Sequence, residues 1–364
     1  MFEFTHKEFS MKRATYLMVA GLAWIGMGLA PGTGATVSAD VTLTGAGATF
    51  PKPIYDKWGA VYSAAHPEVV INYQGIGSGG GIKQIIGKTV DFGATDGPMT
   101  DKQIESAPAT ILHIPTVLGA VVPTYNLPGV EGRLVFSGQV LADVYLGKIT
   151  NWNDPAITAL NPDVKLPGQP ISTVHRSDGS GTTYIFTDYL SKVSDAWKSG
   201  PGFATTVNWP IGRGAKGNDG VAADVKQNPY SLGYVELIYA DHNNIAYGDV
   251  INANGKPVKA SIESVSAAAG SLKDVPDDLR VSITNAPGDD AYPISSLTWI
   301  LVYQDQANAA RGKAMVDFLW WAIHDGQSLG ASLTYAPLPK TFVPLVEKKL
   351  ESITANGQPL LEQK

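Results

Sequence analysis

Cysteine is absent from the 364 residues of this sequence, and long hydrophobic runs are scarce. Without cysteine, the chain can form no disulfide and can carry no lipid on a cysteine after a signal peptide. Its main apolar run, residues 16–30, is interrupted by three glycines and ends at Pro31, so it is shorter than the roughly 20 residues of a membrane-spanning helix. We therefore expect a freely soluble mature chain without a lipid anchor.

The N-terminus has the features of a secretory signal peptide. Lys12 and Arg13 precede the apolar run, and residues 37–39, Val-Ser-Ala, form a cleavage pattern before Asp40. These features predict a signal peptide over residues 1–39 that is cleaved on export. A periplasmic location best suits a mature chain without cysteine.

Positive charge is also limited. The full chain has 27 lysines and arginines against 33 aspartates and glutamates, a net charge of −6. Removal of residues 1–39 leaves 24 against 31, or −7. Nucleic acid is therefore not expected as a partner. A small anion is not excluded, because a buried site depends on its local donors rather than on the charge of the whole molecule.

The sequence does contain a candidate anion site. Residues 175–183 read His-Arg-Ser-Asp-Gly-Ser-Gly-Thr-Thr. Arg176 offers a planar cation, and Ser180, Thr182 and Thr183 offer hydroxyl groups. Apolar residues then recur at helical spacing, which predicts a helix whose exposed first-turn amides attract an anion. A capped surface loop with an Arg–Asp pair has the same residues, so this stretch alone leaves both interpretations open.

A second turn, residues 45–51, reads Gly-Ala-Gly-Ala-Thr-Phe-Pro and precedes a predicted helix. Ile54, Trp58 and Tyr62 fall on one face of that helix. Thr49 is predicted at its N-cap, where its hydroxyl would accept a hydrogen bond from the first turn.

A third turn, residues 75–81, reads Gly-Ile-Gly-Ser-Gly-Gly-Gly between a predicted strand and a short helix. The turn fits the G-x-G-x-x-G pattern of dinucleotide sites. However, Gly87 ends the helix early, and Ser78 supplies a side-chain donor where dinucleotide sites use backbone amides alone. The pattern therefore favours a small anion.

Asp96 lies in residues 91–98, Asp-Phe-Gly-Ala-Thr-Asp-Gly-Pro. A carboxylate close to an anion site repels the ligand unless the ligand carries a proton that the carboxylate accepts. The alternative is an Asx turn closed on Gly97. The sequence alone leaves both interpretations open.

Groups for catalysis or metal binding are not clustered. Ser78 and Ser180 do not lie in a G-x-S-x-G motif, and the histidines and carboxylates show no metal-ligand spacing. We therefore expect no catalytic residue, no metal and no cofactor. His175 lies beside Arg176, and we expect it to be structural.

The length predicts two domains. Periodicity and turn residues predict strands at 41–44, 69–74, 111–122, 171–174, 276–284 and 292–303, helices at 51–62, 82–86, 137–147, 184–193 and 307–327, and a long loop at 199–219.

Taken together, residues 45–51, 75–78, 91–96 and 175–182 resemble the periplasmic phosphate-binding proteins of phosphate ABC transporters. The resemblance spans nearly the whole mature chain. It implies an α/β fold of two lobes, each a mixed sheet flanked by helices, with the ligand in the interdomain cleft. The expected lobes are residues 40–116 with 293–364, and residues 117–292.

The resemblance also implies the partners and the site. The partners would be inorganic phosphate and the membrane permease of the transporter, and the chain would be a monomer without enzymatic activity. Asp178 would pair with Arg176 and hold it in place. The implied phosphate ligands are Thr49, Phe50 (through its backbone amide), Ser78, Asp96, Arg176, Ser180, Gly181 and Thr182.

Two other functions use the same kind of site. A phosphate-ester hydrolase would hold a phosphoryl group in the same cradle, and a binding protein for sulfate or molybdate would hold another tetrahedral oxyanion. Asp96 is the residue that distinguishes a phosphate site from a sulfate site, because sulfate has no proton to donate to a carboxylate at neutral pH. A phosphate sensor uncoupled from transport would have an identical site.

Overall fold

The computed structural model describes residues 41–361, and the predicted signal peptide lies outside them. The strands are β1 (Val41–Gly47), β2 (Val69–Gly75), β3 (Phe92–Thr95), β4 (Ile111–Asn126), β5 (Val135–Phe136), β6 (Ser172–Arg176), β7 (Arg213–Ala215), β8 (Ser231–Glu236), β9 (Ala246–Tyr247), β10 (Asp249–Ile251), β11 (Pro257–Val258), β12 (Ser295–Tyr303), β13 (Thr354–Ala355) and β14 (Gln358–Pro359).

The helices are α1 (Lys52–Ala65), α2 (Ser78–Ile86), α3 (Asp101–Glu105), α4 (Gly138–Tyr145), α5 (Pro155–Thr158), α6 (Gly181–Val193), α7 (Asp195–Ser199), α8 (Gly217–Gln227), α9 (Leu237–Asn243), α10 (Ile262–Ala269), α11 (Ala309–Ile323) and α12 (Val343–Glu351), with 3₁₀ turns η1 (Asp325–Leu329) and η2 (Ala331–Leu333). Across residues 41–361, none of these helices combines the length and the apolar character needed to span a bilayer.

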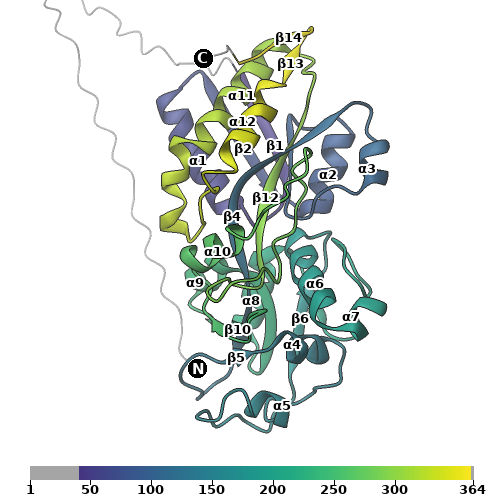
Figure 1. The fold of residues 1–364 in the computed structure, drawn as a ribbon, viewed down its shortest axis with the longest axis vertical. Coiled ribbons are helices and arrows are strands. Elements are labelled where there is room, and N and C mark those ends of the chain that lie inside the picture. Colours follow the sequence, from purple (N-terminus) through teal and green to yellow (C-terminus); the bar gives the residue numbers. More distant parts are fainter. Residues whose placement is uncertain (1–40, 362–364) are drawn as a thin grey trace, which may run out of the picture. The chain divides into compact units, whose positions relative to one another are not determined.

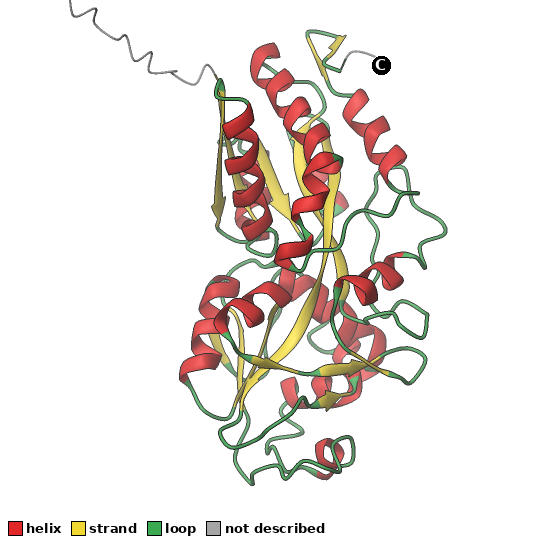
Figure 2. Ribbon diagram, turned by 90° about the vertical axis from the view of Figure 1, so that its left-hand side faces the viewer, coloured by secondary structure: helices red, strands yellow, loops and turns green. Residues whose placement is uncertain are grey.

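The main sheet is mixed and has the strand order β2-β1-β3-β12-β4-β8-β6-β7, with β9 beside β4. The pairs β1–β2, β1–β3, β6–β7 and β6–β8 are parallel, whereas β12 and β4 pair antiparallel with their neighbours. Figure 2 shows helices packed along the faces of the sheet. These elements confirm the predicted α/β class.

Strand β4 belongs to both ends of the sheet. Its first part, Ile111–Ala120, pairs with β12, and its last part, Val121–Asn126, pairs with β8. All its residues except Asn126 are buried. An apolar run without alternation is typical of a strand that is covered on both faces. In Figure 1, β4 and β12 run side by side through the middle of the molecule.

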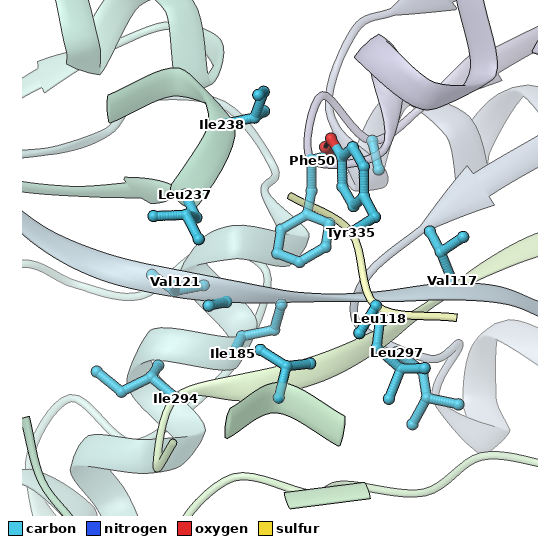
Figure 3. Close-up of a cluster of buried hydrophobic side chains, with 14 of the residues drawn as sticks. Phe50, Val117, Leu118, Val121, Ile185, Leu237, Ile238, Ile294, Leu297 and Tyr335 are labelled. Carbon is cyan, nitrogen blue, oxygen red and sulfur yellow. Dashed lines mark hydrogen bonds between the residues drawn. The ribbon is translucent and has the colours of Figure 1, made fainter. Parts of the chain in front are cut away.

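A cluster of buried apolar side chains surrounds this crossing (Figure 3). Leu118 and Val121 of β4 and Leu297 of β12 are inaccessible to solvent. The rings of Phe50 and Tyr335 lie 6.4 Å apart, and the Tyr335 hydroxyl donates to the Phe50 carbonyl at 2.6 Å. The turn before α1 is therefore fixed against the crossing strands.

Helix α1 corrects the predicted role of Thr49. The helix buries Ile54, Trp58 and Tyr62 as expected, but its N-cap is Pro51, and no side chain caps it. Proline has no N–H, so the helix start has one fewer donor to satisfy. The Thr49 hydroxyl is left for contacts elsewhere in the molecule.

Two further sequence predictions are wrong. Residues 276–284 form no strand, because Leu279 has a left-handed φ of 59° and the segment turns. Residues 199–219 are not one loop, because they contain β7 and the start of α8. The predicted helix 307–327 is helix α11 followed by η1.

Gly81 allows α2 to pack against the backbone of β1 and β3. A Cβ at this position would lie 2.6 Å from Gly47 Cα and 2.7 Å from the carbonyl oxygens of Ala46 and Ala94. Rigid backbone cannot yield as a side chain can. We expect Gly81→Ala to lower the free energy of unfolding, measured in urea, by about 1–3 kcal/mol.

Gly80→Ala is the matched control in the same helix. Its Cβ would meet the end of the Ile76 side chain, 2.9 Å from Cδ1, which can rotate away. We expect this variant to be neutral or more stable by up to about 1 kcal/mol, because alanine favours helices. Equal losses in both variants would contradict the proposed backbone contact.

Candidate functional site

The eight predicted ligand residues are all buried. They come from the turn before α1, the start of α2, the end of β3, and the segment from β6 to α6. Ser180 is the N-cap of α6, and its hydroxyl accepts from the Thr183 amide at 3.0 Å. Hydrogen bonds between these elements bring the separate sequence motifs together.

Arg176 is held by a two-point ion pair. Its Nε and Nη2 donate to the two carboxylate oxygens of Asp178 at 2.8 and 2.6 Å. Burial raises the pKa of Asp178, but the hydrogen bonds and charge of Arg176 outweigh this and lower it below the ordinary value. The amide of Gly217 adds a further donor to Asp178 at 3.0 Å. The pairing leaves Nη1 to face Thr182, whose Oγ1 it contacts at 3.3 Å.

Ser78 connects α2 with α6. Its Oγ accepts from the amide of Gly181 at 2.9 Å and from the amide of Asp96 at 3.2 Å. A hydroxyl oxygen has two lone pairs and one proton, so both acceptor positions are occupied. The Ser78 proton is thereby left to donate. Close by, the amide of Gly79 donates to the carbonyl of Gly179 at 2.9 Å.

Asp96 is 1% exposed, and its two carboxyl oxygens differ. Oδ1 accepts from the Thr298 hydroxyl at 2.7 Å, whereas Oδ2 has no hydrogen-bond partner among the described residues. A Cβ on Gly181 would lie 2.4 Å from Oδ2, so this oxygen faces the start of α6. Burial raises the pKa of Asp96 to about 7.

The Asx turn considered for Asp96 is not formed. The amide of Gly97 donates to the Thr95 hydroxyl at 3.2 Å, and Asp96 points away to Thr298. The carboxyl group is therefore free of the local turn. Its unpaired oxygen is an acceptor at a site that otherwise presents donors.

Asn218, the second residue of α8, is a site residue that the sequence prediction missed. Its Nδ2 donates to Thr49 Oγ1 at 2.9 Å and to Thr182 Oγ1 at 3.0 Å. Its Oδ1 accepts from the amide of Glu236 at 3.0 Å. Asn218 thereby joins the turn before α1 to the start of α6.

Glu236 is a second carboxyl group that the sequence prediction missed, and it is fully buried. Its Oε2 accepts from the amide of Ile238 at 2.9 Å, and its Oε1 has no partner among the described residues. Burial raises the pKa of Glu236 well above the ordinary value. The raised pKa favours the neutral form of this acid, which adds no negative charge near the site.

His175 takes no part in the site. Its ring stacks on Trp209 at 4.9 Å, and its Nδ1 lies 3.0 Å from the carbonyl of Arg176.

Within residues 41–361, no three histidine, aspartate or glutamate side chains are grouped so that they could hold a metal ion. Chemically, the described groups can bind an anion through a fixed cation, hydroxyls and amides, and can accept one proton from it.

The chain resembles known binding proteins over most of its length. The family model of the PBP superfamily domain matches residues 33–325. The phosphate-binding protein PstS of Pasteurella multocida is 45% identical over 323 residues, which cover 88% of this chain and 93% of that protein.

Two solved structures have the same fold. A high-affinity periplasmic phosphate-binding protein, solved with bound phosphate, has a TM-score of 0.71 at 20% identity and covers 85% of this chain and 93% of its own. The phosphate-binding protein of Stenotrophomonas maltophilia has a TM-score of 0.66 at 18% identity, with the same coverage. These likenesses confirm the predicted two-lobed binding-protein fold.

Glu236 predicts a pH dependence of stability. Its folded-state pKa lies above the ordinary value of 4.5, so the folded protein holds this proton more tightly than the unfolded chain does. The stability that this proton contributes is fully present below about pH 4.5. As the pH rises, the free energy of unfolding falls by up to about 1.4 kcal/mol per pH unit. Since glutamine cannot ionise, we expect Glu236→Gln to gain stability relative to the parent as the pH rises.

Urea unfolding of both chains from about pH 4 to about pH 8 measures this difference. The exposed Glu105→Gln serves as the control for the loss of a surface carboxyl group. A Glu236→Gln curve that stays parallel to that of the parent would show that burial does not raise the pKa of Glu236.

Proposed function

This chain belongs to the PBP superfamily and within it to the PstS phosphate-binding proteins, and we propose that it binds inorganic phosphate in the periplasm and delivers it to the membrane permease of a phosphate ABC transporter. The observation that carries the proposal is the unpaired, buried Oδ2 of Asp96, which lies near the Ser78 hydroxyl and within the electrostatic influence of Arg176. Such a site matches an anion that still carries a proton.

The proposed phosphate ligands are those predicted from the sequence. Arg176 neutralises negative charge and donates from Nη1, while hydroxyl and amide groups at the helix starts bind the remaining oxygens. Each such hydrogen bond to a charged ligand contributes roughly 1.5–3 kcal/mol net. The full set is Thr49, Phe50, Ser78, Asp96, Arg176, Ser180, Gly181 and Thr182, with Asp178 in support.

The proposed lobes are residues 40–116 with 293–364, and residues 117–292. The pairing of β4 supports this division, since its partner changes from β12 to β8 after Ala120. Gly79–Gly179, Ser78–Gly181 and Thr49–Asn218 are then contacts between lobes. Because the ligand groups are buried, phosphate enters when the lobes separate, and it favours the closed form by contacting both.

The remaining parts of the proposal concern location and chemistry. We propose that residues 1–39 direct export and that the mature chain is a monomer without a lipid anchor. We also propose that phosphate leaves the site unchanged, as in a binding protein for transport. Titration calorimetry of the mature chain, stripped of ligand, tests the central claim: phosphate should bind saturably at neutral pH and sulfate should not. Failure of both anions to bind would refute it.

Arg176→Ala should abolish measurable phosphate binding. The change removes the buried cation and leaves Asp178 with its charge next to the anion. Loss of the buried cation together with its charge-assisted hydrogen bond from Nη1 corresponds to a fall in affinity of about a thousandfold or more. Titration calorimetry gives the affinity, and thermal unfolding shows whether the variant is folded.

The matched control is Arg213→Ala. Arg213 forms a comparable pair with Asp224, but its side chain is 36% exposed and the pair lies outside the site. We expect its phosphate affinity to equal that of the parent. A folded Arg176→Ala variant with parental affinity would exclude Arg176 as a ligand.

Asp96→Asn should weaken the discrimination between phosphate and sulfate. The amide replaces an acceptor by a donor at the position of Oδ2, so sulfate no longer meets an unpaired carboxylate and phosphate loses a partner for its proton. We expect the ratio of the two affinities to fall by about tenfold or more. Parallel titrations with phosphate and sulfate at neutral pH measure this ratio.

Asp188→Asn is the control for this prediction. Asp188 is also buried, at 6% exposure, but it binds the hydroxyls of Ser282 and Thr284 away from the site. The ratio of phosphate to sulfate affinity in the Asp188→Asn variant should match that of the parent. Unchanged selectivity in Asp96→Asn would remove the role assigned to Asp96.

A further inference from the structure

We propose that Asn218 is a positioning residue that forces the hydroxyls of Thr49 and Thr182 to act as hydrogen-bond donors to the bound anion. The inference rests on the proposed function, because it deepens the account of the same phosphate site. Asn218 is fully buried and lies between the two threonines. It would determine which oxygens of the ligand the site accepts without contacting the ligand itself.

The orientation of the Asn218 amide is fixed by the backbone. The amide of Glu236 is a donor, and it lies 3.0 Å from one atom of the side chain, which must therefore be the oxygen Oδ1. The nitrogen Nδ2 is then turned towards the threonines. Its two protons go to Thr49 Oγ1 at 2.9 Å and Thr182 Oγ1 at 3.0 Å.

Each threonine oxygen accepts a second hydrogen bond. Thr49 Oγ1 also accepts from the backbone amide of Asn218 at 3.2 Å, and Thr182 Oγ1 also accepts from Arg176 Nη1 at 3.3 Å. Both lone pairs of each hydroxyl are thus occupied. Each hydroxyl has only its proton left to offer, and no acceptor among residues 41–361 takes it. An oxygen atom of the ligand is the acceptor that the arrangement leaves room for.

Ser78 is fixed in the same way by two backbone amides, of Asp96 and Gly181. Three hydroxyls are then obligatory donors, and Asp96 Oδ2 is the unpaired acceptor facing α6. A freely rotating hydroxyl would accept a proton from a ligand as readily as it donates one. Fixing its direction restricts protonated ligand oxygens to the position beside Asp96. The selectivity assigned to Asp96 therefore depends on Asn218 as well.

The experiment uses the mature chain and two substitutions of Asn218. Asn218→Asp keeps the acceptor for Glu236 but presents an oxygen to both threonines, so their protons turn towards the introduced carboxylate and away from the ligand. Asn218→Leu removes the donor without adding charge. With inorganic phosphate in titration calorimetry, we expect affinity to fall by about a hundredfold or more in Asn218→Asp and by about tenfold in Asn218→Leu.

Asn161 supplies the matched control. It is 5% exposed, and its amide group bridges Val135 and Ile157 in the same manner, but outside the site. Asn161→Asp and Asn161→Leu should lower the thermal unfolding temperature without changing phosphate affinity. If the Asn218 variants and the Asn161 variants show the same losses of stability and the same phosphate affinities, Asn218 has only a structural role and the proposal is overturned.

A double-mutant cycle shows whether Asn218 acts through the threonines. In a Thr49→Val/Thr182→Val background, Asn218→Leu should change phosphate affinity by less than about twofold, because the hydroxyls it positions are gone. A full, additive loss in that background would overturn the proposal. If the unmodified chain itself binds no phosphate, the proposed function fails, whereas a normal parent with fully active Asn218 variants contradicts the positioning role alone.

Discussion

The buried ion pair of Arg176 and Asp178 is the interaction on which the rest of the site depends. An unpaired guanidinium at 1% side-chain exposure would be costly, and breaking such a pair costs roughly 3–5 kcal/mol. Asp178 binds Nε and Nη2 of Arg176, so the orientation of the guanidinium group is fixed and Nη1 is directed at Thr182. The amide of Gly217 then places the start of α8 against the pair. The cation thereby positions its neighbours as well as the ligand.

Negative charge near the site must be limited if an anion is to bind. Two carboxyl groups other than Asp178 are buried there, and burial raises the pKa of both, that of Asp96 to about 7 and that of Glu236 well above its ordinary value. A neutral Glu236 adds no repulsion, while its backbone amide fixes the side chain of Asn218. Asp96 is left as the group that, in the proposed site, accepts the proton of the ligand. The same low dielectric that strengthens the donors favours the neutral form of Glu236.

Local signals in the sequence predicted most of this arrangement, and contacts between distant residues account for the errors. The helix at residues 184–193 was correctly predicted, because the spacing of its apolar residues is a local signal. Thr49 was wrongly predicted as a helix cap, since Pro51 is the N-cap of α1 and the partner of the Thr49 hydroxyl, Asn218, lies 169 positions away. Thr298, which binds Asp96 from 202 positions away, was likewise missed. The spacing of apolar residues in α8 was a usable signal, but the preceding glycine-rich stretch concealed where that helix begins.

The contacts across the site differ in kind from those at the crossing strands. Around β4, apolar side chains such as Leu118 and Val121 are fully buried, and they hold β4 and β12 together whether or not a ligand is bound. Across the site the elements are joined by a few hydrogen bonds, such as that of Gly79 to Gly179 and the two of Asn218 to Thr49, each worth about 1 kcal/mol net. These few bonds can be exchanged for bonds to water at little cost. In the closure of the lobes that we propose, the stability of the closed form comes largely from the anion, and this difference would let a transporter distinguish the loaded protein from the empty one.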